Sequence, residues 1–202
     1  MWSEAEPPRL PDRVGVSEEE FYSLEGTDSP WEFLGGRLVM SPSSERQENL
    51  FRFLLILFGA YLDATGAGQV RGSRYPMRLD PRWSPEPDLL VVRAENAHRM
   101  TEKYLDGPAD LVIEIASDWD RNFETREKLP RYREARVPEI WLIEPHKRRL
   151  QVQRLERSSY TTETLTRGPL SPTMLPGFAI DVGWLWEPKL PSTYDCLKRL
   201  LG

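Results

Sequence analysis

The sequence contains few of the cysteine and histidine residues that cross-link small proteins through disulfides or bound metal. Among its 202 residues are one cysteine, Cys196, and two histidines, His98 and His146. A single cysteine excludes a disulfide framework and a cysteine-based zinc cluster. Two histidines exclude most histidine-rich metal sites. A chain of this length can bury a sizeable core without disulfides or bound metal.

Long apolar segments and a basic surplus are also missing. The longest apolar run, residues 54–61, is too short to span a bilayer. No basic segment followed by an apolar stretch stands near residue 1, so we expect no signal peptide, no membrane contact and a cytoplasmic location. The formal net charge of −5 argues mildly against a nucleic-acid binder. Binding depends on the local field, however, more than on the total charge.

The residues that are present indicate a globular α/β protein. Residues 1–16, with several prolines and no period, predict a flexible N-terminal arm, and residues 17–202 predict a single domain. The predicted elements are a helix over 17–24, a hairpin turning at 35–36, a long helix over 44–64, strands over 68–80, 87–93 and 109–117, a helix over 121–136, a strand over 138–145, a hairpin over 148–167 and a helix over 192–201. Pro130 predicts a kink or a late start in the helix over 121–136. This order predicts a mixed sheet with a long helix packed on it.

Three ionisable residues stand at unusual positions in this pattern. Asp88 follows Pro87 and opens an apolar strand, and Glu114 lies inside the strand "LVIEIA". Lys128 follows 14 residues later, on the predicted helix. A carboxylate buried alone in an apolar strand is destabilising unless it is paired or bound to a cation, and such groups are enriched at functional sites.

These residue types suit the hydrolysis of a phosphodiester. Two carboxylates, Asp88 and Glu114, are oxygen ligands of the kind that Mg²⁺ or Mn²⁺ prefers, and the backbone carbonyl of Ile115 is a candidate third ligand. The cation would polarise the phosphate and lower the pKa of its bound water. The ammonium of Lys128 would orient that water or offset the charge that builds on the phosphate.

The same residues resemble a known family. The sequence contains "WEFLGGRLVMSP", "EPDLLVV", "GPADLVIEIAS", "ETREKLPRY" and "RVPEIWLIEP", in this order. This series resembles the PD-(D/E)XK nuclease superfamily and, more closely, the Uma-two family of endonucleases. The resemblance runs from about Trp31 to about Gly183. It implies a restriction-endonuclease-like core, with a mixed sheet, the long helix across it and extra antiparallel strands at the C-terminal end.

The resemblance also implies roles for individual residues. Asp88 and Glu114 match the metal carboxylates, and Lys128 matches a lysine that lies on the following helix in this family. Two supporting residues, Tyr132 and Glu32, match the helix tyrosine and an acid of the hairpin. The sequence departs from the family pattern at Gln47, where a histidine is usual at the start of the long helix. This exchange removes an imidazole that would contact substrate or transfer a proton.

Each of the three central residues also has an ordinary structural interpretation. Asp88 could cap a turn after its proline, and Glu114 could pair with an arginine. Lys128 and Glu124 have the i,i+4 spacing of a surface helix pair. Arg126 and Arg131 flank Lys128 and are the first candidates for contacts to DNA phosphates, although a solvated face is an alternative for both.

Three functions are consistent with this sequence. The first is a Mg²⁺- or Mn²⁺-dependent endonuclease that cuts DNA, and it requires Asp88, Glu114 and Lys128 to converge in one site. The second is a catalytically silent nucleic-acid-binding or protein-interaction module on the same fold, which a solvent-facing Lys128 would favour. The third is a phosphoesterase for a small substrate. A homodimer is expected for the first function, because cutting both strands of a duplex usually takes two active sites.

Overall fold

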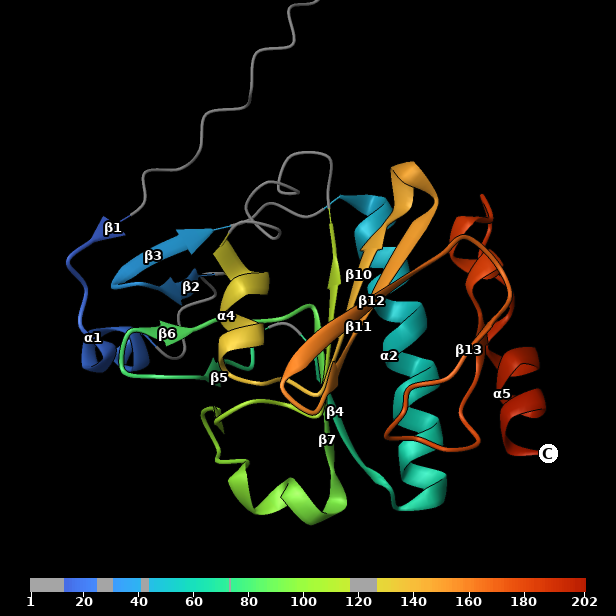
Figure 1. Cartoon of the computed structure of the whole chain (residues 1–202), viewed down its shortest axis with the longest axis horizontal. Helices are drawn as coiled ribbons and strands as arrows, with labels where there is room; N and C mark the ends of the chain where they lie inside the picture. Colours follow the sequence, from blue (N-terminus) through green and yellow to red (C-terminus); the bar gives the residue numbers. More distant parts are fainter. Residues whose placement is uncertain (1–12, 25–30, 41–43, 73, 117–126) are drawn as a thin grey trace, which may run out of the picture.

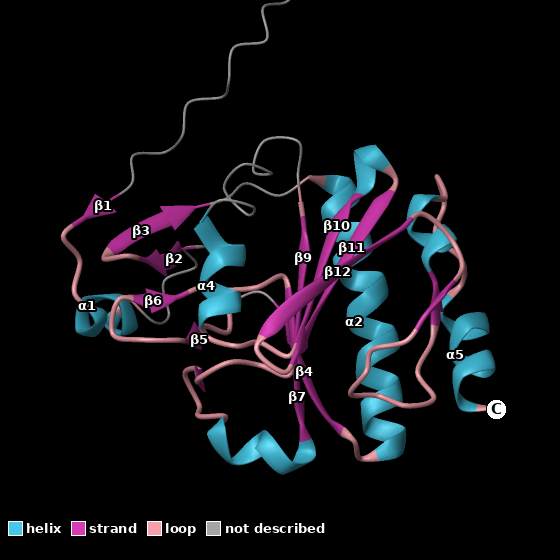
Figure 2. Cartoon of the chain, in the orientation of Figure 1, coloured by secondary structure: helices cyan, strands magenta, loops and turns pink. Residues whose placement is uncertain are grey.

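The computed structural model describes residues 13–24, 31–40, 44–72, 74–116 and 127–202, in which helices pack on both faces of a sheet (Figures 1 and 2). The main sheet consists of β4 (Gly68–Gly72), β7 (Leu89–Arg93), β9 (Leu111–Ile115), β10 (Glu139–Glu144), β11 (Arg149–Glu156) and β12 (Ser159–Leu165). Its strand order is β12-β11-β10-β9-β7-β4, and only β9 and β10 run parallel. This mixed sheet confirms the predicted α/β class.

A smaller sheet lies beside the main one. It contains β1 (Arg13–Val14), β2 (Trp31–Leu34), β3 (Arg37–Met40) and β6 (Trp83–Ser84), in the order β1-β3-β2-β6. The predicted hairpin turn between β2 and β3 has φ values of 62° and 78° at Gly35 and Gly36, which glycine adopts without strain. Residues 85–88 lead directly from β6 into β7. The small sheet is therefore connected to the main sheet by this short segment.

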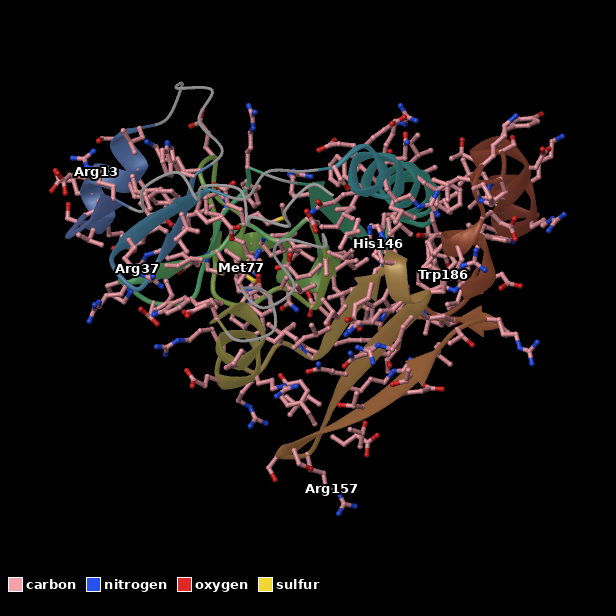
Figure 3. The ribbon with its side chains drawn as sticks, turned by 90° about the horizontal axis from the view of Figure 1, so that it is seen from above. Arg13, Arg37, Met77, His146, Arg157 and Trp186 are labelled. Carbon is pink, nitrogen blue, oxygen red and sulfur yellow. The ribbon has the colours of Figure 1, made fainter. Side chains whose placement is uncertain are left out.

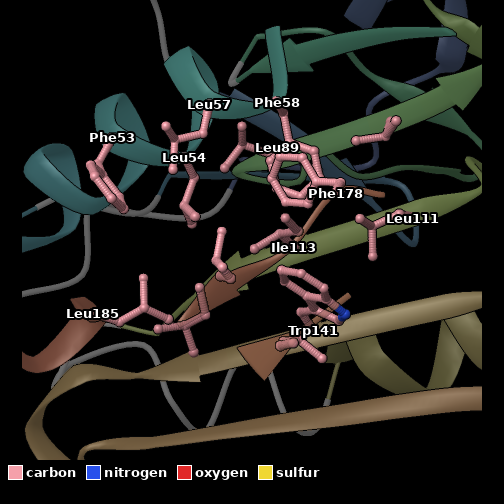
Figure 4. Packing of buried hydrophobic residues seen from close by; sticks show 14 of the residues in the cluster. Phe53, Leu54, Leu57, Phe58, Leu89, Leu111, Ile113, Trp141, Phe178 and Leu185 are labelled. Carbon is pink, nitrogen blue, oxygen red and sulfur yellow. The ribbon is translucent and has the colours of Figure 1, made fainter. Parts of the chain in front are cut away.

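The long helix α2 (Glu45–Thr65) covers one face of the main sheet. Ser44 caps its first turn through a hydrogen bond to the N–H of Gln47, and Gly66 ends it in the left-handed conformation. Figure 4 shows the packing of this face, to which α2 contributes Phe53, Leu54, Leu57 and Phe58 and the sheet contributes Leu89, Leu111, Ile113 and Trp141. Ile56 is exposed on the outer side of the helix. The helix is therefore amphipathic, and less enclosed than its apolar sequence predicts.

The short helix α4 (Leu129–Glu134) covers the opposite face of the same strands. Pro130 lies in its first turn, where a missing N–H carries no penalty, so the predicted late start is correct. The rest of the predicted helix over 121–136 falls mainly on residues 121–126, which lie outside the described residues. The core on this side consists of Leu90 and Val92 from β7, Val112 from β9, Leu129 and Tyr132 from α4, and Ile140 and Leu142 from β10.

The remaining elements surround these layers. Helix α1 (Glu18–Ser23) begins with a capping box of Ser17 and Glu20. Helix α5 (Thr193–Leu201) packs on α2 and buries Cys196. The other short elements are β5 (Met77–Arg78), β8 (Leu105–Asp106), β13 (Pro169–Leu170), β14 (Ile180–Asp181) and the 3-10 turns Ala94–Arg99, Pro145–Lys147 and Val182–Trp186.

Two further expectations bear on the ends and surface of the chain. Residues 13–14, within the stretch expected to form a flexible arm, instead pair with β3 as strand β1, and residues 1–12 lie outside the described residues. His98 and His146 are both exposed. In the described part of the chain, every helix is too short or too polar to cross a membrane.

Candidate active site

Strands β7 and β9 bring Asp88 and Glu114 together. The antiparallel register pairs Leu90 with Val112, and its continuation places Asp88 opposite Glu114, where β-carbons lie about 4.5–5.5 Å apart. Side chains alternate between the two faces of a strand. Leu90 and Val112 pack on the α4 side, so Asp88 and Glu114 also project to that side.

Each carboxylate has one oxygen engaged in hydrogen bonds. Oδ2 of Asp88 accepts a hydrogen bond from the N–H of Ile115 at 2.6 Å. Oε1 of Glu114 accepts one from the hydroxyl of Tyr132 at 2.5 Å and lies 2.8 Å from Nζ of Lys128. Oδ1 of Asp88 and Oε2 of Glu114 receive no hydrogen bond from the residues that the structure describes. The site therefore has two carboxylate oxygens available for a ligand.

Lys128 directs its ammonium into the protein. Its side chain is 2% exposed, and the residue stands at the N-terminal cap of α4. Nζ lies 3.1 Å from Oε2 of Glu32 and donates to the backbone carbonyl of Glu86 at 3.3 Å. A buried ammonium is stable only when it is paired in this way. Lys128 is therefore the buried counter-ion shared by Glu114 and Glu32.

Glu32 reaches this site from the small sheet. It lies on β2, is 8% exposed, and accepts a hydrogen bond from the N–H of Glu86 at 3.0 Å. Glu86 belongs to the segment that connects β6 to β7, and its carbonyl binds Lys128. Its backbone thus holds two charged side chains in place. Sequence reasoning missed Glu86, because nothing in the pattern distinguishes a residue that acts through its main chain.

The carboxyl groups of the site have raised pKa values. Burial raises the pKa of Asp88 to about 7, and the charge of Glu114 adds to this rise against the opposing charge of Lys128. Burial and the neighbouring Glu32 raise the pKa of Glu86 to about 8. Burial also raises the pKa of Glu32, although Lys128 opposes the rise. Four acids surround one ammonium, so a bound cation would be stabilised by the charge of the site.

The arrangement is compatible with a divalent cation. The donors are Oδ1 of Asp88, Oε2 of Glu114 and the carbonyl of Ile115, which lies on the same side of β9 as its N–H. Within the described residues no group of three or more Asp, Glu, His or Cys side chains could hold a metal. Mg²⁺ is commonly held by one or two carboxylates with waters completing its shell, so the two-carboxylate donor set fits this ion.

The supporting residues differ in their relation to the site. Tyr132 and Glu32 contact it directly, as described above. Gln47 lies in the first turn of α2, and within the described ranges it makes no hydrogen bond to Asp88, Glu114 or Lys128; its Oε1 is buried without a partner. This buried amide oxygen is a polar group for which the described residues provide no donor.

Of the two predicted DNA contacts, Arg131 and Arg126, the structure describes only Arg131. The guanidinium of Arg131 stacks over Trp83 at 4.4 Å from the ring centroid and lies 2.8 Å from Glu134. Its charge is thus already paired at the surface. Arg126 lies outside the described residues, as does Glu124, so the surface pair of Glu124 with Lys128 is not described.

The ordinary interpretations of the carboxylates do not match these contacts. Asp88 accepts a hydrogen bond from the neighbouring strand, 27 residues away, and not from its own turn. Glu114 pairs with a lysine and a tyrosine instead of an arginine. Lys128 is buried, although the silent-module hypothesis favours a solvent-facing side chain. The three residues converge as the hypothesis of a nuclease requires.

Comparisons with known proteins found a matching family model and a solved structure of similar fold. A family model, Uma2, described as "Putative restriction endonuclease", matches residues 18–183. The solved structures include a similar protein, "a putative nuclease belonging to DUF820 from Anabaena variabilis ATCC 29413", which is 15% identical with a TM-score of 0.70. The match covers 85% of this chain and 97% of that one. At this identity the likeness shows a shared fold. No curated protein matches the chain.

Proposed function

The chain belongs to the Uma2 family of restriction-endonuclease-like proteins, and on this premise we propose that it is a divalent-metal-dependent endonuclease that hydrolyses DNA phosphodiester bonds. Asp88, Glu114 and Lys128 are its catalytic residues. Mg²⁺ or Mn²⁺ is its cofactor, held by Asp88, Glu114 and the carbonyl of Ile115.

One observation supports this proposal above all others. Asp88 and Glu114 lie opposite each other on adjacent strands, each with one oxygen without a hydrogen bond from a described residue, and a buried ammonium lies 2.8 Å from the second carboxylate. Structural ion pairs do not need free carboxylate oxygens, whereas cation binding does. Raised pKa values at a cluster of buried acids are also typical of active sites.

Each residue of the site would have a separate role in the reaction. A bound divalent cation supplies the polarisation of the phosphate and a lowered pKa of the attacking water. Asp88 and Glu114 hold the site in a fixed geometry, because the Ile115 N–H and the Tyr132 hydroxyl each restrain one carboxylate. Lys128 stabilises negative charge that builds on the phosphate oxygens. Glu32 and the carbonyl of Glu86 position the Lys128 ammonium for this role.

The substrate and assembly follow from the reaction class. DNA is the proposed substrate, and Arg126 and Arg131 are proposed contacts to its phosphates. Double-strand cleavage would take two active sites, so we also propose a homodimer that uses the C-terminal strands and tail.

Plasmid nicking tests this function. Supercoiled plasmid and a single-stranded oligonucleotide would be incubated with Mg²⁺ and then Mn²⁺, using wild type, Asp88→Asn and Lys128→Ala. We expect metal-dependent nicking by wild type and a loss on the order of 10³-fold in each variant. The matched control is Asp181→Asn, a carboxylate near β14 that caps a turn away from the site.

The outcomes separate the alternatives. Equal nicking by wild type and both variants would show a contaminating nuclease and overturn the site assignment. Absence of nicking with either metal, for protein whose circular dichroism shows a folded state, would overturn the endonuclease function. The silent binding module and the small-substrate phosphoesterase would then be separated by DNA gel shift and by hydrolysis of a chromogenic phosphodiester.

A further inference from the structure

A second polar cavity lies at the far end of α4 from Lys128. It has a volume of about 520 Å³ and is formed by the end of α4, the turn after it and the β11–β12 hairpin. Its lining includes two arginines and three hydroxyl side chains: Arg133, Arg136, Ser158, Ser159 and Thr162. Nothing in the proposed catalytic site uses any of these residues.

The two arginines of the cavity carry charge that no acid among the described residues neutralises. Arg133 donates from Nε to Oε1 of Gln153 at 2.8 Å, and Arg136 donates from Nη2 to the carbonyl of Arg157 at 2.9 Å. These bonds orient both guanidinium groups and leave other N–H groups for a ligand. Among the described residues, neither arginine forms an ion pair, whereas nearby Arg131 is paired with Glu134.

The backbone supports a role for the arginine side chains. Arg136 and Arg157 have φ values of 62° and 55°, in the left-handed region that favours glycine. Arg136 follows the C-terminal cap of α4, where glycine is the usual residue. Figure 3 shows Arg157 at the tip of the β11–β12 hairpin, projecting away from the body of the protein. Arginine thus occupies positions where a smaller residue would suit the turn.

The charges of the cavity converge on one point. Burial raises the pKa of Tyr160, and the guanidinium groups of Arg136 and Arg133 both oppose this rise, so both lie near the Tyr160 ring. One acid, Glu134, also lines the cavity, but its carboxylate is 2.8 Å from Arg131. Two orientated guanidinium groups and hydroxyl side chains that line the same cavity are a site for a planar or tetrahedral oxyanion.

We propose that this cavity binds a backbone phosphate of the DNA, at a subsite separate from the point of cleavage; this inference rests on the proposed nuclease function. Helix α4 connects the two places. Its six residues span about 9 Å, which corresponds to two to three base-pair steps along a duplex at about 3.4 Å each. A strand that enters the catalytic site can therefore reach Arg133 and Arg136.

The test measures DNA affinity without cleavage. A fluorescent duplex would be titrated in Ca²⁺ or EDTA at several salt concentrations with wild type and with the Arg133→Gln/Arg136→Gln variant. We expect about tenfold weaker binding and a salt slope smaller by about 0.9, because one phosphate contact is lost. The control Arg52→Gln/Arg199→Gln removes the same charge from α2 and α5, on the other side of the sheet, and should bind as wild type does.

A conservative variant and a second ligand sharpen the result. Arg133→Lys/Arg136→Lys keeps the charge but loses the guanidinium fork, so it should retain the salt slope and bind with intermediate affinity. Equal losses in the test and control variants would overturn the proposal, because they would reflect bulk charge alone. An unchanged affinity in the test variant would overturn it as well. Tight binding of inorganic phosphate that needs Arg133 and Arg136, with DNA affinity unchanged, would assign the cavity to a free anion instead.

These outcomes are independent of catalysis. If the wild type nicks plasmid and the test variant binds DNA normally, the subsite fails and the nuclease function stands. If the wild type binds DNA through Arg133 and Arg136 and never cuts it, the subsite stands and the nuclease function fails.

Discussion

The two faces of the main sheet are built from the same strands and differ sharply in chemistry. Along β9, Leu111, Ile113 and Ile115 point toward α2 and join a cluster of buried apolar side chains. Between them, Glu114 points toward α4, where it meets Lys128 and Tyr132. The alternation of a strand thus places an apolar core on one side and, on the other, a second apolar core that also contains a buried ionic cluster.

This contrast separates stability from function within one sheet. Burial on the α2 side removes mainly apolar area from water at about 25 cal/mol per Å², and its buried carboxylate, Glu139, accepts hydrogen bonds from Trp141 and Thr173. On the α4 side, Glu32, Glu114 and Lys128 are buried at a cost that ion pairing offsets only in part. A protein selected only for stability would have apolar residues on both faces. The α2 face therefore supports the ionic cluster on the α4 face.

The largest expected effect concerns Lys128, the counter-ion of the buried acids on the α4 side. Lys128→Met should lower the free energy of unfolding by about 3–5 kcal/mol, because Glu32 and Glu114 lose their shared counter-ion. Urea denaturation measures this change. Adding Glu32→Gln and Glu114→Gln to the variant should restore part of the lost stability, since all three buried charges are then gone. A loss below about 1 kcal/mol for Lys128→Met would contradict its role as the buried counter-ion.

The apolar face offers the complementary change. Leu57→Ala on α2 should lower the free energy of unfolding by about 2–5 kcal/mol, because it removes a fully buried side chain and leaves a cavity. Nicking per folded molecule should remain at the wild-type rate, since the helix lies on the other side of the sheet. Urea unfolding and plasmid nicking at low temperature would be measured on the same preparation. A selective loss of activity in the folded variant would contradict the assignment of stability to the α2 face and of function to the α4 face.

A smaller effect is expected at the hydroxyl that restrains Glu114. Tyr132→Phe removes a hydrogen bond to a buried carboxylate and should lower the free energy of unfolding by about 1.5–3 kcal/mol. The ring still packs, so the variant isolates the hydrogen bond from the aromatic core. Tyr160→Phe is a suitable control, because its hydroxyl binds the Val137 carbonyl instead of a carboxylate. A Tyr132→Phe variant as stable as wild type would argue that Lys128 alone satisfies Glu114.

The smallest effect concerns pH. The pKa of Asp88 is raised to about 7, so its carboxyl is mainly protonated below that pH. A cation requires the deprotonated form. The apparent affinity for Mn²⁺ should therefore rise about tenfold per pH unit below pH 7 and level off above it. Calorimetric titration between pH 5.5 and 8.5 tests this, with Asp88→Asn as the control that should lack the slope. An affinity independent of pH would exclude Asp88 as the titrating ligand.

The candidate residues were found because charges are conspicuous in apolar strands. Asp88 after Pro87 and Glu114 between isoleucines break the local pattern, and Lys128 and Tyr132 lie one helical turn apart. Helix ends have equally clear local signals: Ser17 and Ser44 cap the starts of α1 and α2, and Gly66 ends α2. These features are local, because each depends on residues within about four positions.

Other parts of the site have no local signal. Glu86 acts through its peptide groups, which every residue possesses, so only the meeting of the two sheets reveals it. Nothing in the sequence indicates that Arg131 contacts an aromatic ring, yet Trp83, from a strand of the small sheet, stacks under its guanidinium. The polar cavity lined by Arg133 and Arg136 lies between α4 and a hairpin that begins more than ten residues later in the chain. Such contacts depend on how distant segments pack.

The sequence by itself determined the class of the fold, helix α2, the strands of the main sheet and the identity of the three central charged residues, because hydrophobic periodicity and helix capping are short-range effects. The tertiary structure decided which oxygen of each carboxylate is engaged, which acids share Lys128 and which arginines remain unpaired. Those properties arise from burial and from distances of a few ångströms between segments far apart in the chain, and electrostatic energies depend on both.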